Sequence, residues 1–361
     1  MMRGFAALYV MTGHLVHHYS LGLGARVDKW VAEPLRFGQE AVMLFFLISG
    51  FVIFYSTEKK RPDFATYFIH RWKRIYPIFL ISLCLISIDI VILKSAPFPW
   101  HDFFGNIFML QDMAGKTPGV WFPTFGYNLP LWSLAYEWWF YFLFYPIWRF
   151  APIRQQRIIA ALISFIGLFG YVLYPNQPCL YLAYFILWWT GAELARQYVA
   201  EGRVTFKIQR ITIAVLAGFV GLTAGLLLLA HHYNHWIAVR SRSEQYPFLE
   251  IRHFMICWLI VVGALTWQKI KWFGFNFLFG IFKYVAPISY GIYALHYPIA
   301  ITGSFFSFIP WEVAKLFVVI VASFAAAWLA EVPFQKLVNH LTRFLPNKAI
   351  VFPEKVVRNT L

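Results

Sequence analysis

An arginine and a histidine stand in the first apolar segment of the chain, at Arg3 and His14. Their spacing amounts to three helical turns and a small remainder, so both side chains lie on one face of a helix, about 16 Å apart along its axis. An ionisable side chain inside an apolar span is a functional candidate by default, because its burial in lipid is costly. A neutral imidazole suits proton transfer near neutral pH, which makes His14 a candidate catalytic base. A core histidine bonded to a neighbouring helix is the alternative interpretation.

The second set of candidates is cationic. The segment 57–77 is strongly basic, and within it Arg71 and Arg74 stand one helical turn apart, so that they project together. Paired guanidinium groups at a membrane surface suit phosphate, because they form charge-assisted, bidentate hydrogen bonds. Cytoplasmic loops of membrane proteins are rich in Lys and Arg for reasons of topology alone, and this explanation covers most charges of the segment.

A carboxylate interrupts the aromatic segment 129–142. Ser133 and Glu137 are four residues apart, so they share a helical face. A lone carboxylate at membrane depth is costly unless it is paired or faces water. Glu137 is therefore expected to orient His14, to bind a polar acceptor, or to form a structural ion pair with an arginine.

A polar stripe marks a later apolar segment, in which Ser289, Tyr293 and His296 recur at helical spacing. Such a stripe predicts either interhelical hydrogen bonds or a direct chemical role. Ser49 and Gly50 are small neighbours in another apolar segment, and we interpret them first as a site of close helix packing.

The composition indicates the elements that must position these residues. Of the 361 residues, 60% are hydrophobic, 21% aromatic and only 13% charged. A soluble domain has about 25% charged residues, so much of this protein's surface must face lipid. The formal net charge of +15 follows from the basic cytoplasmic loops of a membrane protein, and no nucleic-acid partner is expected. The three cysteines show no metal-type spacing, so neither a metal site nor a disulfide framework is predicted.

We predict an all-α membrane protein, a bundle of about ten transmembrane helices, because its apolar segments approach the roughly 17–25 residues that cross a bilayer. The segments are 4–20, 38–56, 75–93, 131–149, 158–174, 179–196, 211–231, 253–268, 285–304 and 313–331. With the amino terminus in the cytoplasm, 22 of the 31 Lys and Arg residues fall on the cytoplasmic side. This bias predicts that the N- and C-termini are both cytoplasmic.

The segments between and after the spans have expected roles as well. Residues 1–334 are expected to form one transmembrane domain, and 335–361 a cytoplasmic C-terminal tail. The segment 98–112 is too short to cross the bilayer and is predicted to be re-entrant or interfacial. Substrate specificity is expected to reside in the outer loops, because loops carry recognition; these are 21–37, 94–130 and 232–252.

Six short motifs, read in order along the chain, resemble those of the acyltransferase-3 family. They are RGFAALYVMTGH from Arg3 to His14, FFLISGFVIF, RWKRIYP beginning at Arg71, WSLAYE ending at Glu137, SYGIYALH ending at His296, and EVPF beginning at Glu331. Their order and the ten predicted spans match the family over residues 3–334, nearly the whole chain.

The resemblance implies a multi-pass enzyme of the bacterial inner membrane that acylates hydroxyl groups, most often by acetylating surface sugars such as those of polysaccharides or lipopolysaccharide. It implies that acetyl-CoA is the acyl donor, a cosubstrate, and that a cell-surface or lipid-linked glycan is the acceptor. No metal is implied. Some members carry a further C-terminal esterase-like domain, whereas this chain continues only about thirty residues beyond its last predicted span. Direct acylation of the acceptor by the membrane domain is therefore expected.

The resemblance also implies roles for the residues on the donor side. The family's catalytic histidine corresponds to His14, and its activity-determining basic residues to Arg3, Arg71 and Arg74. The three arginines would bind the phosphates of acyl-CoA at the cytoplasmic mouth. His14 would act as general base on the acceptor hydroxyl, or would carry the acyl group itself.

On the acceptor side, Glu137 is the second predicted catalytic residue and would polarise His14 or position the acceptor. The predicted substrate-binding residues are Ser133, Tyr293 and His296.

A carrier of a lipid-linked sugar or of a proton-coupled solute is the alternative function. Carriers also use intramembrane His, Glu and Arg side chains. Many of them show inverted repeats with broken helices at matching positions in two halves. The sequence shows no such repeat, which favours the enzyme.

Overall fold

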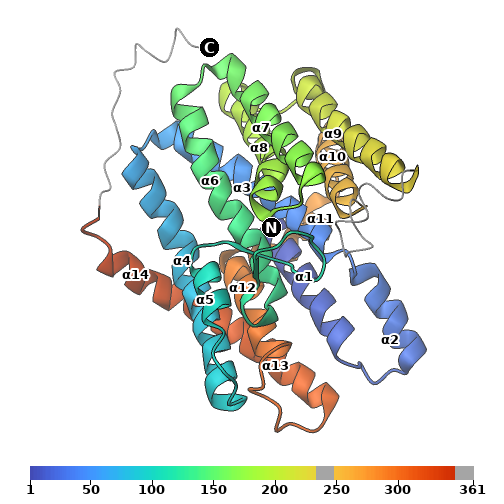
Figure 1. The fold of residues 1–361 in the computed structure, drawn as a ribbon, viewed down its shortest axis with the longest axis vertical. Coiled ribbons are helices and arrows are strands. Elements are labelled where there is room, and N and C mark those ends of the chain that lie inside the picture. The colour runs from blue at the N-terminus through green and yellow to red at the C-terminus, as the bar shows by residue number, and fades with distance from the viewer. Residues whose placement is uncertain (233–247, 346–361) are drawn as a thin grey trace. The chain divides into compact units, whose positions relative to one another are not determined.

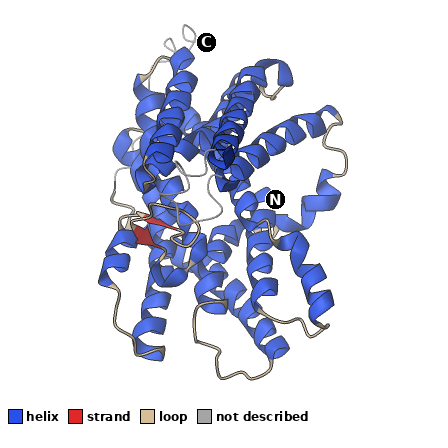
Figure 2. Cartoon of the chain, turned by 45° about the vertical axis from the view of Figure 1, so that its right-hand side comes forward, coloured by secondary structure: helices blue, strands red, loops and turns tan. Residues whose placement is uncertain are grey.

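The computed structural model describes residues 1–232 and 248–345. Throughout these residues the chain is mostly helical (Figure 1). Their only β-sheet is one parallel pair of short strands, β1 (Gln111–Asp112) and β2 (Phe122–Pro123), red among the blue helices of Figure 2. The predicted all-α class is confirmed. Residues 233–247 of the predicted outer loop and 346–361 of the predicted tail lie outside the described residues.

Each of the ten apolar segments overlaps a helix, and in the segment 285–304 the α-helix covers only Ser289–Ala300. The α-helices are α1 (Met2–His18), α2 (Ala25–Ala32), α3 (Gly38–Lys60), α4 (Phe64–Ile88), α5 (Trp100–Ile107), α6 (Trp132–Phe150), α7 (Ile153–Leu173), α8 (Gln177–Glu201), α9 (Phe206–His232), α10 (Phe248–Lys269), α11 (Phe275–Phe279), α12 (Ser289–Ala300), α13 (Glu312–Leu329) and α14 (Gln335–Leu341). The predicted non-spanning segment contains α5, whose eight residues extend about 12 Å, too short to cross a bilayer.

Six stretches of the described residues are long and apolar enough to cross a membrane by length and composition. They are Ala25–Lys60, Phe64–Leu93, Ile153–Leu173, Phe206–Leu229, Glu250–Lys269 and Glu312–Leu341. A seventh arises if Phe275–Lys283 and Ala286–Ala300, which meet at a 53° bend, form one broken span. Three helices at predicted spans are outside this set: α1 has 17 residues, at the lower limit of a span, while α6 and α8 are rich in Trp and Tyr. The ten-span topology stays a prediction.

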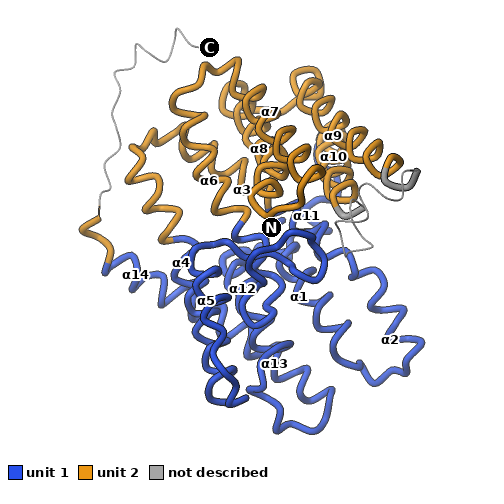
Figure 3. Tube along the Cα trace, in the orientation of Figure 1, with its two compact units in different colours: residues 1–45, 74–135, 270–341 blue, residues 46–73, 136–269, 342–361 orange. Residues whose placement is uncertain are grey.

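The chain forms two compact units, coloured separately in Figure 3. Unit 1 comprises residues 1–45, 74–135 and 270–341, and unit 2 comprises 46–73, 136–269 and 342–361. Each unit is assembled from segments far apart in the sequence, and the helices α3, α4 and α6 contribute residues to both.

The short helix α12 lies in the core of unit 1, where all of its residues but Tyr290 are buried. It packs on α1 and α13 through an apolar cluster that includes Ala7, Met11 and Ile292. Gly291 permits a close approach, because a β-carbon there would lie 2.9 Å from the Cα atom of Ala327 on α13. The residues that α12 carries are therefore held by packing on two sides.

A loop with buried polar anchors precedes α6 in unit 1. The Asn106 amide donates to the carbonyl oxygens of Asp102 and Pro123, at 2.8 and 2.9 Å, and its oxygen accepts from the backbone N–H of Phe125 at 3.0 Å. Asn128 donates to the Ser82 hydroxyl at 2.9 Å. These buried hydrogen bonds give the irregular chain over 106–128 a defined path.

Unit 2 contains the antiparallel neighbours α7 and α8 and the pair α9 and α10. A buried carboxylate, that of Glu193 on α8, is compensated by Arg157 at 2.7 Å and Arg196 at 3.0 Å. The indole N–H of Trp189 also donates to this carboxylate, at 2.8 Å. This ion-pair network satisfies a charge that would otherwise be costly to bury.

Candidate functional site

The structure brings His14 of α1 directly onto His296 of α12, within unit 1. His14 Nδ1 lies 2.9 Å from His296 Nε2, and the two ring planes are inclined by only 13°. His14 is half-buried, whereas His296 is completely buried. The ring of Tyr297 stands edge-on to His14, with the ring centres 4.9 Å apart. An imidazole pair is therefore the centre of the candidate site.

Two of the predicted substrate-binding residues, Ser133 of α6 and Tyr293 of α12, meet in the same unit as this pair. The Ser133 and Tyr293 hydroxyls form a 2.8 Å hydrogen bond, and Ser133 also donates to the carbonyl oxygen of Pro130 at 3.4 Å. Tyr293 packs against the Phe45 ring at 5.4 Å between centres. Of the polar stripe, Tyr293 and His296 thus make interhelical hydrogen bonds, while Ser289 bonds only locally, to the Ala286 carbonyl oxygen.

The polar loop of unit 1 adds a cation to the surroundings of His14. Lys116, in the chain between β1 and β2, lies close enough to act electrostatically on the His14 ring, as does His17 of α1. Lys116 is exposed and belongs to the predicted outer loop 94–130. Its electrostatic influence on His14 has no signal in the sequence, because the two residues lie on segments a hundred residues apart.

Arg74 has a different environment from the one that the sequence suggests. Its guanidinium donates to the Glu331 carboxylate, which is 1% exposed, and lies over the Tyr290 ring at 5.5 Å. The other Glu331 oxygen accepts from the backbone N–H of Gly291 at 3.0 Å. Arg74 and Glu331 thereby fix the first turn of α12, which is a structural role, and a phosphate-binding role for Arg74 stays a prediction.

We expect Glu331→Ala to destabilise unit 1 by about 1–3 kcal/mol, because the buried N–H of Gly291 and the guanidinium of Arg74 both lose their acceptor. Thermal unfolding of the purified protein in detergent would measure the loss. Glu33→Ala is the matched control, since Glu33 pairs with Arg36 where both side chains are more than half exposed. Equal stability of the two variants would contradict the structural role of Glu331.

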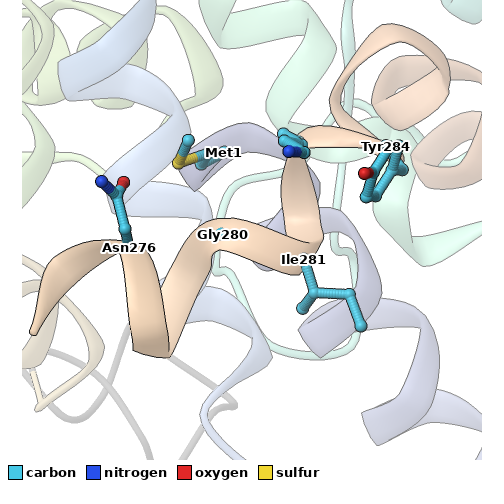
Figure 4. Close-up of a pocket in the computed structure, with 6 residues that line it drawn as sticks. Met1, Asn276, Gly280, Ile281 and Tyr284 are labelled. Carbon is cyan, nitrogen blue, oxygen red and sulfur yellow. The ribbon is translucent and has the colours of Figure 1, made fainter.

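Arg3 lies near the start of α1 and forms no hydrogen bond or ion pair with the residues that the structure describes. A pocket of about 530 Å³ opens at the same end of α1, lined by residues that Figure 4 draws as sticks: Met1, Asn276, Gly280, Ile281, Lys283 and Tyr284. Because Lys283 adds its ammonium group to the lining, this end of unit 1 is cationic and suits an anionic ligand.

The predicted catalytic carboxylate, Glu137, lies in a polar cluster of unit 2. One of its oxygens, Oε1, accepts from the Ser49 hydroxyl and, at 2.5 Å, from the Tyr141 hydroxyl. The Trp188 indole donates to Ser49 at 3.2 Å. Among the described residues Oε2 has no hydrogen-bond partner, so Glu137 keeps a free acceptor. The ion pair considered for Glu137 is not formed among these residues.

Arg71 belongs to this unit as well. Its guanidinium is 3.5 Å from the Ser56 hydroxyl, lies over the Tyr67 ring at 5.3 Å, and acts electrostatically on Tyr141. Its Nε atom is buried and has no partner among the described residues. Arg71 thus combines a weak hydrogen bond with an uncompensated charge, which leaves it able to bind an anion.

The eight predicted site residues therefore fall in both units. Unit 1 holds Arg3, His14, Arg74, Ser133, Tyr293 and His296, and unit 2 holds Arg71 and Glu137. Sequence reasoning missed Tyr297 as a neighbour of His14 and the electrostatic influence of Lys116 on it, and it assigned Ser49 to packing although its hydroxyl also bonds Glu137. The action of Glu137 on His14 stays a prediction.

Comparison with known proteins agrees with the six motifs that resemble the acyltransferase-3 family. The family described as an acyltransferase domain, acyltransferase-3, matches residues 1–332. Acyltransferase MdmB of Streptomyces mycarofaciens is 29% identical over 170 residues, which are 44% of this chain and 42% of that protein, so the match spans less than half of the relative's length. No solved structure matches the chain. Because the family match covers nearly all the residues that carry the spans and the motifs, this membrane protein belongs to the acyltransferase-3 family.

Proposed function

We propose that the protein is a membrane O-acyltransferase that moves an acyl group, in the first instance acetyl, from cytoplasmic acyl-CoA to a hydroxyl of a cell-surface or lipid-linked glycan. The observation that carries the proposal is the contact of His14 with His296 inside a domain of an acyltransferase family. This pair supplies a neutral proton acceptor that a second helix orients.

The donor would bind through its phosphates. Arg3 and Arg71 have no ion-pair partner among the described residues, and Lys283 lines the pocket at the start of α1. Acyl-CoA carries several negative charges, and guanidinium groups bind phosphate through charge-assisted hydrogen bonds. Arg74 contributes less to this role, because Glu331 already compensates its charge.

In the transfer step, His14 takes the proton of the acceptor hydroxyl while the hydroxyl oxygen forms a bond to the acyl carbon. The bond between this carbon and the CoA sulfur then breaks, and the sulfur leaves with the proton from His14. In the alternative order of steps, His14 first attacks the acyl carbon, the bond between this carbon and the CoA sulfur breaks, and CoA leaves as the thiolate. The acceptor oxygen then displaces His14 from the acyl carbon, and the hydroxyl proton passes to the released nitrogen of His14 and from there to the thiolate. In either mechanism only the acyl group crosses the membrane.

The protein would lie in the bacterial inner membrane, and the acceptor would approach from the outer side of this membrane. In unit 2, Glu137 has a free carboxylate oxygen beside the Ser49 and Tyr141 hydroxyls, and in unit 1, Ser133 and Tyr293 present a pair of hydroxyls. Such groups recognise sugar hydroxyls by hydrogen bonds. Lys116, from the outer loop 94–130, acts on His14 and would contribute to the choice of acceptor.

The proposal is tested by incubating the purified protein in lipid nanodiscs with acetyl-CoA labelled in the acetyl group. Mass analysis of surface glycans from cells with and without the gene would identify the acceptor to be added. We expect label in the glycan only when the protein is present. Absence of CoA binding and of transfer, combined with movement of a sugar or proton-coupled solute across vesicles, would instead establish a carrier.

Arg3→Ala and Lys283→Ala are each expected to raise the KM for acetyl-CoA, because each variant loses a cation that faces the donor's phosphates. The loss of a hydrogen bond between charged groups amounts to about 1.5–3 kcal/mol, or about 10- to 100-fold. Initial rates over a range of acetyl-CoA concentrations measure the effect. Arg26→Ala, on the exposed surface of α2, serves as the control. Unchanged KM values in both variants would exclude this end of α1 as the donor site.

A further inference from the structure

We propose that His296 is a positioning residue that fixes the proton of His14 on Nδ1 and so makes Nε2 the reactive nitrogen. The proposal rests on the proposed acyltransferase function for its catalytic consequence, while the protonation pattern itself follows from hydrogen bonds within unit 1.

The first step concerns His296 alone. Its Nδ1 lies 2.7 Å from the carbonyl oxygen of Ile292, one turn earlier in α12. A carbonyl oxygen only accepts hydrogen bonds, so Nδ1 of His296 must carry a proton. The ring is completely buried and has no carboxylate partner among the described residues, which favours the neutral form. In a neutral imidazole the second nitrogen, Nε2, then has a lone pair.

The second step is that the lone pair on His296 Nε2 determines which nitrogen of His14 carries the proton. Because His296 Nε2 can only accept, His14 Nδ1 must donate across the 2.9 Å that separates them. The ring centres are 5.2 Å apart and the planes differ by 13°. The distance from each ring centre to its nitrogen, counted once for each ring, and the N···N distance together equal the separation of the two centres. The two centres and the two nitrogens therefore lie on one line, so the rings meet edge to edge and the N–H points along the lone pair.

The third step is chemical. With its proton on Nδ1, His14 presents an unprotonated Nε2, which takes the acceptor's proton or attacks the acyl carbon. The opposite tautomer would place the proton on Nε2 of His14, which could then act neither as a general base nor as a nucleophile. When Nε2 gains a proton, the charged ring still donates from Nδ1 to His296, and this hydrogen bond stabilises the imidazolium. His296 itself neither gains nor loses a proton in the transfer.

The structure also holds His296 in place independently of His14. The Ser82 hydroxyl donates to the carbonyl oxygen of Ala294 at 3.0 Å, and the Tyr19 hydroxyl donates to that of Ala300. Glu331 binds the N–H of Gly291 at the start of the helix. A partner fixed in this way orients His14 before the substrates arrive, as a preorganised site requires.

The tautomer can be measured by nitrogen NMR on protein labelled with ¹⁵N-histidine, with His14→Ala used to assign the signals of His14. We expect a protonated Nδ1 and an unprotonated Nε2 in the wild type. His296→Leu should lose this pattern, whereas His296→Gln should keep it, because the amide oxygen can accept from Nδ1. Ser289→Ala is the matched control, a buried polar residue of α12 that bonds only Ala286. A protonated Nε2 in the wild type would overturn the proposal whatever the activity.

Kinetics separate this proposal from the proposed function. His296→Leu should lower kcat about 100-fold with the KM for acetyl-CoA unchanged, and His296→Gln should recover much of the loss. If His296→Leu keeps wild-type kcat while His14→Ala is inactive, the positioning role is wrong and the acyltransferase function stands. If the wild type transfers no acyl group, the proposed function fails, and with it the catalytic role of His296.

Discussion

His14→Ala is expected to lower acyl transfer to the labelled glycan by about 10²- to 10⁴-fold, the contribution of a general acid–base residue, or to abolish it if His14 carries the acyl group. The cause is local, because the variant removes the only imidazole that His296 orients among the described residues. The assay is transfer of labelled acetyl groups by purified protein, normalised to the folded fraction.

The control for this variant is His18→Ala, four residues further along α1, where the imidazole is exposed and packs against the Tyr19 ring. We expect wild-type transfer from this control. His14→Ala leaves the buried Nε2 of His296 without a donor, so a stability loss of about 1–3 kcal/mol should accompany the loss of activity. Wild-type transfer by a folded His14→Ala protein would overturn the proposed mechanism.

The same variant distinguishes the two mechanisms, in which His14 is either a general base or the carrier of the acyl group. If His14 carries the acyl group, wild-type protein incubated with labelled acetyl-CoA but no acceptor should retain label, and His14→Ala should not. If His14 is a general base, neither protein retains label, and CoA is released only when an acceptor is present. Acid quenching followed by mass analysis of the peptide that contains His14 reads out the result.

The sequence predicts the helices of this protein well, for a physical reason. A span needs a continuous apolar stretch, and such a stretch is visible in the sequence, so each of the ten segments overlaps a helix. The shared face of Arg3 and His14 also follows from helical geometry alone, since α1 runs without interruption over Met2–His18. Local periodicity thus determines what lies on one helix.

Contacts between helices are where the sequence is uninformative. His14 and His296 are separated by 282 residues, and nothing in either motif specifies that their rings meet. Arg71 and Arg74 look equivalent in the sequence, yet Glu331 compensates only Arg74. Likewise the 53° bend before α12 and the two units, each assembled from distant segments, depend on packing that no local pattern encodes.

A second large effect is expected in unit 2, where Gly50→Val and Gly191→Val should each prevent stable folding. The two glycines lie on α3 and α8, and each faces the backbone of the other helix. A β-carbon at Gly50 would lie 2.0 Å from the carbonyl oxygen of Trp188, and one at Gly191 would lie 2.0 Å from that of Leu47. These contacts are with backbone atoms, so the two helices would have to separate.

We expect a loss of about 3 kcal/mol or more for either substitution, at or above the upper end of overpacking effects, because no side chain can move to relieve the clash. Gel filtration in detergent and thermal unfolding are the measurements. Gly218→Ala on α9 and Gly263→Ala on α10 are the matched controls, since a β-carbon at either site meets nothing within 4 Å. Alanine is a better helix former than glycine by about 1 kcal/mol, so these controls should be unchanged or slightly stabilised.

The close approach of α3 and α8 also connects this packing to the candidate site. Ser49, next to Gly50, donates to Glu137 and accepts from Trp188, so the same contact that excludes a side chain at Gly50 sets the hydrogen bonds of Glu137. Gly50→Ala, the mildest test, should therefore lower the transfer rate per folded molecule as well as the yield of folded protein. If the folded Gly50→Ala protein kept the wild-type melting temperature, the tight crossing of α3 and α8 would be wrong. If instead it lost stability but kept the wild-type rate, Glu137 would not depend on this crossing for its function.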